Sequence, residues 1–270
     1  CDQLCCYCGC HTTVVNTRAP VSEYVSTLLT EIALVRDAAG PRTVSAIHLG
    51  GGTPNMLAPE DMDRLFGALR AAFDIAPDAE IAAEIDPRTL TPEWVAAAAR
   101  AGMNRCSIGV QDIDPAVQKA INRVQPIGMT ERAVGLLRQA GIASINMDLI
   151  YGLPHQTIGT IRDTVRAIAA LEPDRIALFG YAHVPWMKPA QKLLPEDRLP
   201  GADDRFAQQD AAASELVAAG YDRIGLDHFA RAGDPLARAL REGRAFRDFQ
   251  GYTTHRYDAL IGLGASSISR

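Results

Sequence analysis

Five of the six cysteines in this chain lie within its first ten residues. Three of them, Cys1, Cys5 and Cys8, follow the pattern C-x-x-x-C-x-x-C. Cysteine thiolates are the usual ligands of iron–sulfur clusters, and three on one short loop can hold three irons of a [4Fe–4S] cluster. The fourth iron then stays open to a small molecule, which makes the cluster a catalytic centre. We therefore predict that Cys1, Cys5 and Cys8 bind such a cluster.

A structural zinc site is the main alternative, because C-x-x-C pairs are common in zinc proteins. Zinc usually takes four nitrogen or sulfur ligands from two separated segments, and no second C-x-x-C follows in this sequence. Adjacent cysteines point apart, so Cys6 is not expected to bind the same irons, and neither is Cys10. Cys106 falls on the apolar face of a predicted strand and is expected in the core.

The length and composition limit the classes of protein to consider. The chain has 270 residues, enough for one large α/β domain or two small ones. A net charge of −5 argues against nucleic acid or a membrane surface as the main partner, and no apolar run has the length of a transmembrane helix. Clustered cysteines are typical of metal sites in a reducing compartment, so we expect a cytoplasmic protein. The chain starts inside a motif, which predicts a fragment.

Predicted strands and helices alternate along the chain, as in a parallel sheet with right-handed crossovers. Strands are expected at 44–50, 80–86, 105–110, 144–150 and 175–180. Helices are expected at 59–73, 92–101, 130–139 and 157–171. Residues 184–204 are rich in proline, lysine and aspartate and predict a long loop. After it we expect a helix at 205–219, a further element at 221–229 and a short helix at 235–241.

Several of these strands are polar on one face only. The polar or small faces comprise three sets: Ala82, Glu84 and Asp86; Arg105, Ser107, Gly109 and Gln111; Ser144, Asn146 and Asp148. Buried parallel strands are ordinarily apolar on both faces. One polar face suits a barrel whose lumen holds a polar ligand, and barrel sites form at the carboxyl ends of strands. The candidate ligand-binding residues are Glu84, Gln111, Arg123 and Asp148.

The cysteine spacing, with the aromatic Tyr7 directly before Cys8, resembles that of the radical S-adenosylmethionine (SAM) enzymes. A second segment, 48–54, ends a predicted strand in three glycines. Glycine lets a ligand approach the backbone because no Cβ stands in the way, so this segment is expected to contact the methionyl end of SAM. A simple tight turn is the alternative. Neither a GxGxxG nor a P-loop pattern is present, which argues against a site for a dinucleotide or a nucleoside triphosphate.

Taken in order, the motifs closely resemble the family of oxygen-independent coproporphyrinogen III oxidases, radical SAM enzymes of haem biosynthesis. The resemblance covers essentially the whole chain. The CxxxCxxC and GGGT motifs are shared by many radical SAM enzymes, whereas the C-x-C that ends at Cys10, DHFAR and FQGYTT are far more specific. The matching segments are 1–10, IHLGGGTPN (47–55), EIDPRTLT (84–91), GMNRCSIGVQDIDPAVQKAINRVQ (102–125), NMDLIYGLPHQT (146–157), GYAHVPWMKPAQ (180–191), GLDHFARAGDPLA (225–237), REGRAFRDFQGYTT (241–254) and LGASSIS (263–269).

This resemblance implies an α/β fold with a partial (β/α)6 TIM-like barrel over 1–183. Residues 184–270 would form an α/β extension that completes the side of the barrel and the substrate cleft. Two parts of the family pattern have no counterpart in this sequence. These are an aromatic–histidine strand before the first cysteine and a C-terminal helical domain.

The resemblance also implies a reaction. A radical generated from SAM removes a hydrogen from the β-carbon of a substrate propionate, which then loses CO₂ and one electron to leave a vinyl group. Two such steps convert coproporphyrinogen III to protoporphyrinogen IX. The family binds two SAM molecules, and Gly51, Glu84 and Ile268 would contact the one on the cluster. The contacts to the second would be Tyr7, Gly52, Thr53, Gln111, Arg123, Asp148 and Ala182.

The implied partners are coproporphyrinogen III, an electron donor such as flavodoxin or ferredoxin, and an electron acceptor that the sequence does not identify; a monomer is expected. Lys188, Arg231 and Arg241 are candidates for binding the substrate carboxylates. His183 and His228 either contact the substrate or have a structural role.

The alternative functions are those of a related radical SAM methyltransferase, a cyclopropane-forming or haem-degrading enzyme, or a haem chaperone. The chaperones are expected to lack the C-x-C, and DHFAR and FQGYTT count against all of these alternatives.

Overall fold

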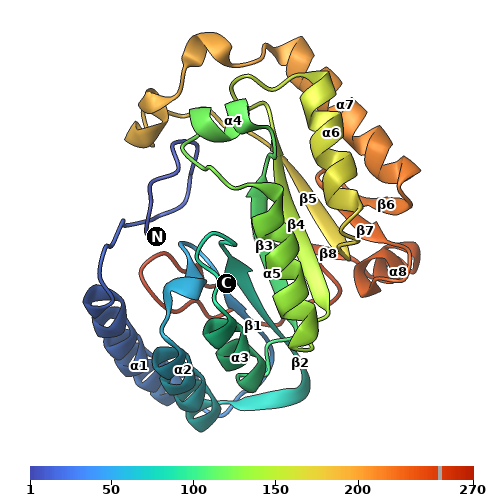
Figure 1. Ribbon diagram of the computed structural model, residues 1–270. Coiled ribbons are helices and arrows are strands. Elements are labelled where there is room, and N and C mark those ends of the chain that lie inside the picture. The colour runs from blue at the N-terminus through green and yellow to red at the C-terminus, as the bar shows by residue number, and fades with distance from the viewer. Residues whose placement is uncertain (249–250) are drawn as a thin grey trace.

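The computed structural model describes residues 1–248 and 251–270, and its centre is a curved seven-stranded sheet (Figure 1). The strand order is β1-β2-β3-β4-β5-β7-β6, and β1 to β5 are all parallel. The strands are β1 (Thr43–Leu49), β2 (Asp74–Ile85), β3 (Arg105–Gln111), β4 (Ser144–Tyr151), β5 (Arg175–Gly180), β6 (Tyr221–Ile224) and β7 (His228–Arg231). The α/β partial barrel expected from the sequence is confirmed.

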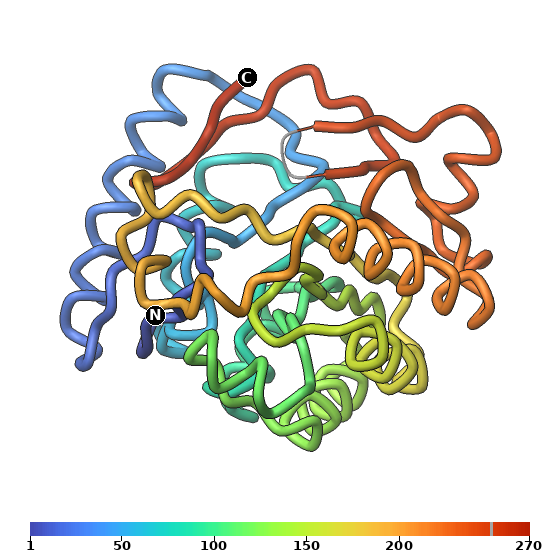
Figure 2. The backbone as a smooth tube through the Cα atoms, turned by 90° about the horizontal axis from the view of Figure 1, so that it is seen from above, coloured from blue at the N-terminus to red at the C-terminus, as the bar shows by residue number. Residues whose placement is uncertain are grey.

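Most of the helices lie along the outer side of the sheet, whereas α4 lies beyond the carboxyl end of β3 (Figures 1 and 2). They are α1 (Ala19–Ala39), α2 (Pro59–Ala72), α3 (Pro92–Arg100), α4 (Pro115–Ala120), α5 (Ile127–Gln139), α6 (Ile158–Ala169), α7 (Ala202–Ala218) and α8 (Pro235–Arg241). Short 3-10 turns, η1 (Pro54–Met56), η2 (Pro189–Leu193) and η3 (Glu196–Arg198), and a hairpin of β8 (Phe246–Asp248) and β9 (Gly251–Thr253) complete the described elements. In the described part of the chain, no helix has both the length and the apolar character needed to span a membrane.

The core lies between the sheet and these helices. On β3, Cys106, Ile108 and Val110 are buried on the face that packs against the helices, as expected for Cys106. Most of the helices begin where the sequence provides a side-chain cap or a proline. Thr157, for example, forms a capping box with Thr160 at the start of α6. Since each buried aliphatic side chain contributes roughly 1.5–3 kcal/mol, this face provides most of the driving force for folding.

The predicted elements at 44–50, 105–110, 144–150 and 175–180 agree with β1, β3, β4 and β5. β2 starts six residues earlier than predicted, because Pro77 and a register shift in its pairing with β1 interrupt the alternation of side chains. The predicted loop at 184–204 contains η2 and η3, and the segment 221–229 is the antiparallel hairpin β6–β7 on the edge of β5. The first two residues of the FQGYTT motif, 249 and 250, lie outside the described residues.

A buried polar network fixes the loops that follow β3 and β4. Asp112 is fully buried, and its carboxylate accepts hydrogen bonds from Gln156 Nε2 (2.5 Å), Thr164 Oγ1 (3.2 Å) and the backbone N–H of Asp114 (2.6 Å). Gln118 Nε2 donates to the carbonyl of Asp112 (2.9 Å) and thereby ties α4 to the end of β3. Burial raises the pKa of Asp112 to about 6, although these hydrogen bonds oppose the rise.

This raised pKa predicts a pH-dependent contribution to stability. The folded state favours the protonated carboxyl, so the contribution of Asp112 is lost as pH rises through about 6. We expect the free energy of unfolding of the wild type, taken relative to Asp112→Asn, to increase as pH falls from about 7 to about 5. Urea unfolding over this range measures it, and Asp63→Asn, an exposed carboxylate, is the control. A difference that stays constant with pH would contradict the expectation.

Candidate functional site

The cysteine loop, residues 1–15, lies at the carboxyl ends of the parallel strands (Figure 1). Thr53, which follows β1, donates its hydroxyl to Cys1 Sγ (3.0 Å). The N–H of Cys6 donates to the carbonyl of Ile121 (3.0 Å), in the loop after α4. Gln191 Nε2, beyond β5, donates to the carbonyl of Tyr7 (3.0 Å). Segments that follow three different strands therefore hold the loop at the end of the sheet where barrel sites form.

Each of the three predicted cluster ligands has a donor of its own. In addition to the Thr53 hydroxyl at Cys1, guanidinium nitrogens of Arg88 and Arg123 lie 3.4 Å and 3.6 Å from Cys5 Sγ. The backbone N–H of Cys10 donates to Cys8 Sγ (3.4 Å). Hydrogen bonds from Cys10 lower the pKa of the Cys8 thiol to about 6. Donors and cations stabilise the thiolate, which is the form that binds iron, so this donor set fits a three-thiolate cluster site.

The arrangement gives no support to the zinc alternative. Among the described residues, no group of three or more cysteine, histidine, aspartate or glutamate side chains could hold a single metal ion. A zinc site needs ligands that converge on one point. Each thiolate of a [4Fe–4S] cluster binds a different iron, so its ligands are spread further apart.

The remaining two cysteines of the loop are placed differently. Cys6 is buried among Val117, Ile121 and Tyr181, and this burial raises the pKa of its thiol. Cys10 is exposed, and its hydrogen bond with Cys8 raises the pKa of its own thiol. Cys6 is therefore part of the core, and Cys10 lies beside the predicted ligands.

The glycine-rich segment after β1 contacts Glu84 on β2 and lies beside the C-terminal segment and the cysteine loop. Gly51 has φ of 97°, and its N–H donates to Glu84 Oε2 (3.3 Å). A Cβ at Gly51 would lie 3.1 Å from Ser266 Oγ, and one at Gly52 would lie 3.9 Å from Cys1 Sγ. Two predicted contacts of the first SAM, Gly51 and Glu84, are thus joined directly, and Ile268 is exposed on the same C-terminal segment as Ser266. This segment runs beside α1 (Figure 2).

The polar faces predicted for β3 and β4 are confirmed as one continuous ladder. Ser107 pairs with Asn146 in the register of the two strands. The carboxylate of Asp148 accepts hydrogen bonds from Ser107 Oγ (2.8 Å) and Asn146 Nδ2 (2.7 Å). Burial raises the pKa of Asp148 to about 6, with the charge of Glu84 as a smaller cause in the same direction. Asn146 Oδ1 is buried and has no hydrogen-bond partner among the described residues, which fits a site that takes a polar ligand.

Gln111 and Arg123 meet over Gly109 at the end of β3. Gln111 has φ of 70° and follows a register shift between Gly109 and its own position. Arg123 is buried, and its Nη2 donates to the carbonyl of Gly109 (2.7 Å). The backbone strain at Gln111 is of the kind that structures store at functional sites.

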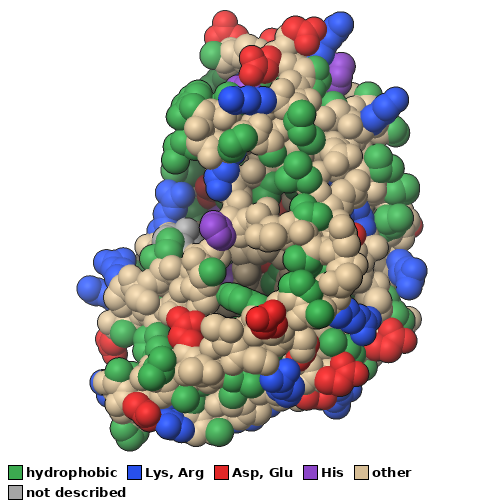
Figure 3. Space-filling view, turned by 90° about the vertical axis from the view of Figure 1, so that its left-hand side faces the viewer, with side chains coloured by type: hydrophobic (Ala, Val, Ile, Leu, Met, Phe, Trp, Pro, Cys, Tyr) green, Lys and Arg blue, Asp and Glu red, His purple; other side chains and the backbone are tan. Residues whose placement is uncertain are grey.

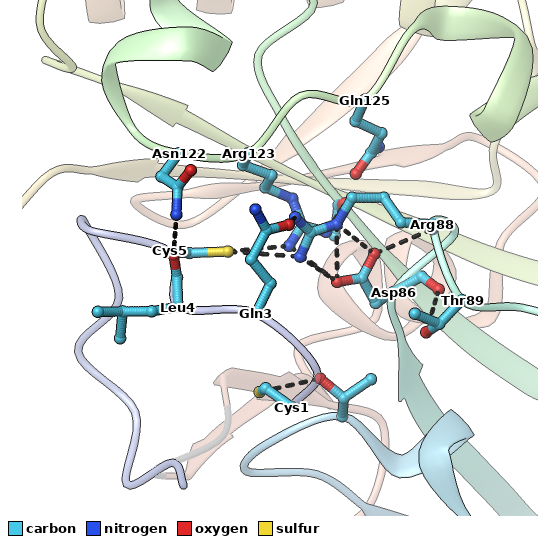
Figure 4. Close-up of polar contacts among 12 residues, drawn as sticks. Cys1, Gln3, Leu4, Cys5, Asp86, Arg88, Thr89, Asn122, Arg123 and Gln125 are labelled. Atoms are coloured by element: carbon cyan, nitrogen blue, oxygen red, sulfur yellow. Dashed lines mark hydrogen bonds and ion pairs between the residues drawn. The ribbon is translucent and has the colours of Figure 1, made fainter. Parts of the chain in front are cut away.

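Several contacts had no signal in the sequence. Gln191 Nε2 donates to the carbonyl of Ala182 (3.1 Å) as well as to that of Tyr7, so one buried amide joins two predicted contacts of the second SAM. Asp86 binds both Arg88 and Arg123 beside Cys5 (Figure 4). The one available clue to Gln191 was its place in the GYAHVPWMKPAQ segment, which carries part of the family resemblance.

The candidates for binding substrate carboxylates separate into two groups. Lys188 Nζ donates to the carbonyl of Cys10 (3.3 Å), so it lies at the cysteine loop. Arg231 pairs with Glu172 (3.2 Å), and its backbone N–H donates to the carbonyl of Asp174, which precedes β5. Arg241 pairs with Asp222 (2.7 Å) on β6. The expectation for the two arginines is wrong, because they lie near the amino end of β5, at the opposite end of the sheet.

The two candidate histidines both have side-chain partners. His183 lies 2.9 Å from Tyr181 Oη and 3.1 Å from Glu196 Oε1. His228 lies 2.7 Å from Asp227 Oδ1, and burial lowers the pKa of its ring. His183 lies in the loop after β5, and His228 begins β7, which pairs with β5.

The close approach at Gly109 gives a testable expectation. A Cβ there would lie 2.9 Å from Gln111 Nε2 and 3.2 Å from Arg123 Nη2, so Gly109→Ala should cost about 1–3 kcal/mol and displace both side chains. The matched control is Gly135→Ala on α5, where no atom lies within 4 Å of the added carbon. This change should stabilise by roughly 0.5–1 kcal/mol. Thermal unfolding compares the two, and equal stability of both variants would contradict the expectation.

Known proteins are similar to this chain in sequence and in fold. The model of the radical SAM superfamily matches residues 1–168. An oxygen-independent coproporphyrinogen III oxidase of Bradyrhizobium diazoefficiens is 51% identical over 99% of this chain and 60% of its own length, and one of Synechocystis is 44% identical over 100% and 58%. The solved coproporphyrinogen III oxidase of Escherichia coli, described as a radical SAM enzyme, matches with a TM-score of 0.96 and 39% identity, over 100% of this chain and 62% of that one. The chain thus spans about three fifths of these relatives, and it belongs to the radical SAM superfamily.

Proposed function

We propose that this chain carries the reaction centre of a coproporphyrinogen III dehydrogenase, which converts two propionate side chains of its substrate to vinyl groups and yields protoporphyrinogen IX. The observation that carries the proposal is the position of the cysteine loop: Cys1 lies against the glycine-rich segment, and Arg123 connects Cys5 to Gly109 on β3. This loop occurs in a chain that is 51% identical to an enzyme of that name. The similarity to these enzymes extends beyond residues 1–168, which the superfamily model matches, and includes the sheet edge formed by β6 and β7.

Cys1, Cys5 and Cys8 would hold the [4Fe–4S] cluster. When bound, the reduced cluster supplies the electron that cleaves SAM and releases a carbon radical. Glu84 would bind the SAM on the cluster, because its carboxylate can accept hydrogen bonds from an ammonium group or from ribose hydroxyls. The positive φ of Gly51 turns the backbone toward this position without a side chain in the way, and Ile268 would cover it.

A second SAM would lie along the polar ladder, and the contacts implied by the family are Tyr7, Gly52, Thr53, Gln111, Arg123, Asp148 and Ala182. Each oxygen of Asp148 already accepts one hydrogen bond from the protein and has capacity for another, which suits a pair of hydroxyls. Gln191 would orient this set, because it holds the carbonyls of Tyr7 and Ala182 together.

Residues 184–270 would complete the side of the barrel and the substrate cleft. The side of the molecule that lies to the left in Figure 1 is hollowed (Figure 3), and this supports an opening there. Lys188 would bind a substrate carboxylate close to the cluster. We further propose a cytoplasmic monomer that takes electrons from a flavodoxin or ferredoxin and passes the substrate electron to an acceptor of its own.

The cluster assignment predicts which cysteines are needed. After anaerobic reconstitution the wild type should hold about four irons and four sulfides per chain. Cys1→Ser, Cys5→Ser and Cys8→Ser should each lose most of this iron, because the cluster then has two thiolates. Cys106→Ala, which removes a buried thiol far from the loop, is the control and should keep it. Iron retained at wild-type level in all three serine variants would refute the ligand assignment.

The reaction predicts a defined change of mass. Reconstituted full-length protein given SAM, a reductant and coproporphyrinogen III should produce a product lighter by two CO₂ and four hydrogen atoms, seen by mass spectrometry. A methyltransferase or a cyclopropane-forming enzyme would instead add mass to its substrate, and a haem chaperone would bind haem with no turnover. Consumption of SAM without any change in coproporphyrinogen III would rule out the proposed substrate.

A further inference from the structure

A buried cluster of three charges lies directly beside Cys5 (Figure 4). Asp86, just past the end of β2, binds Arg88 Nη2 (2.6 Å) and Arg123 Nη1 (3.2 Å). The side chains of all three are at most 10% exposed. Burial opposes ionisation of Asp86, but the hydrogen bonds and charges of the two arginines hold its pKa below the ordinary value. One carboxylate thus balances one of two guanidinium groups, and one positive charge is left over.

The excess charge is directed at the cysteine loop. Arg88 holds Asp86 with Nε and Nη2, and the same Nη2 reaches Cys5 Sγ (3.4 Å), while Nη1 donates to Gln3 Oε1 (3.0 Å). Arg123 lies further from the sulfur (3.6 Å) and gives its other nitrogen to the carbonyl of Gly109. Arg88 is therefore fixed on one side by the carboxylate and bound on the other to the loop that carries the thiols.

We propose that Arg88 is a positioning residue that donates a hydrogen bond to the Cys5 thiolate and raises the reduction potential of the cluster bound there; the inference rests on the proposed cluster. A reduced cluster carries one more negative charge than an oxidised one. A buried cation beside a ligand sulfur stabilises the reduced state more, and hydrogen bonds to the sulfurs act in the same direction. Arg88 is not itself among the residues expected to contact either SAM.

The test compares Arg88→Gln, which removes the charge, with Arg88→Lys, which keeps the charge on a single nitrogen. Arg100→Gln is the matched control, because Arg100 also binds an aspartate, Asp63 (3.0 Å), but lies on the exposed surface of α3. Each protein is reconstituted anaerobically, its iron and sulfide are measured, and its midpoint potential is determined by an EPR-monitored redox titration without substrate.

At a fixed solution potential, the ratio of reduced to oxidised cluster should fall at least tenfold in Arg88→Gln, a shift of about 59 mV for one electron. Arg88→Lys should fall between this variant and the wild type, and Arg100→Gln should match the wild type. Should Arg88→Gln lose its iron, Arg88→Lys decides the question by whether its midpoint potential lies below that of the wild type.

Wild-type potentials in iron-loaded Arg88 variants would overturn the inference. Loss of iron from both variants would overturn it as well, because Arg88 would then be needed only to assemble the site. Failure of the wild type to bind iron would instead count against the proposed function, so the two failures can be told apart.

Discussion

The carboxylate of Asp86 is the contact on which the geometry of the site most depends. It joins the end of β2 to Arg88, which holds the cysteine loop, and to Arg123, which holds the end of β3. Removing one partner of a buried ion pair costs roughly 3–5 kcal/mol, because it leaves a charge uncompensated away from water. With Asp86 in place, two guanidinium groups can be buried together against a thiol.

A second constraint is that each central strand serves the core and the site at once. On β3, Cys106 and Ile108 face the helices, whereas Ser107 and Gly109 face the polar ladder. A slip of one residue would exchange the two faces completely. The hydrophobic packing that stabilises the fold therefore also fixes the direction of the polar side chains, and the cost appears as the raised pKa of the partly buried Asp148.

Much of this arrangement could be predicted because it depends on local patterns. The alternation of polar and apolar residues predicted β1, β3, β4 and β5 and the polar face that carries Asp148. The spacing of the cysteines predicted the cysteine loop. α1 was not predicted: its 21 residues bury only Val25 and Ile32, so the apolar periodicity is weak. The contacts of Arg88 with Gln3 and of Gln191 with Tyr7 join residues 85 and 184 positions apart, and no local pattern reports such pairs. Arg231 and Arg241 were misassigned for the same reason, since an arginine's charge does not tell at which end of a sheet it lies.

The C-terminal segment that packs on α1 has a consequence for the order in which the molecule forms. The N–H of Gly264 donates to Glu31 and that of Ala265 to Tyr24, across 233 and 241 residues, and Ser266 lies beside the glycine-rich segment after β1. Contacts of such long separation form late, because the entropy of closing the chain must be overcome first. A ribosome must therefore release almost the whole of this sequence before that wall of the site can close, whereas β1 to β5 can already pair. Until then the glycine-rich segment after β1 lacks its contact with Ser266, so this side of the site is completed last.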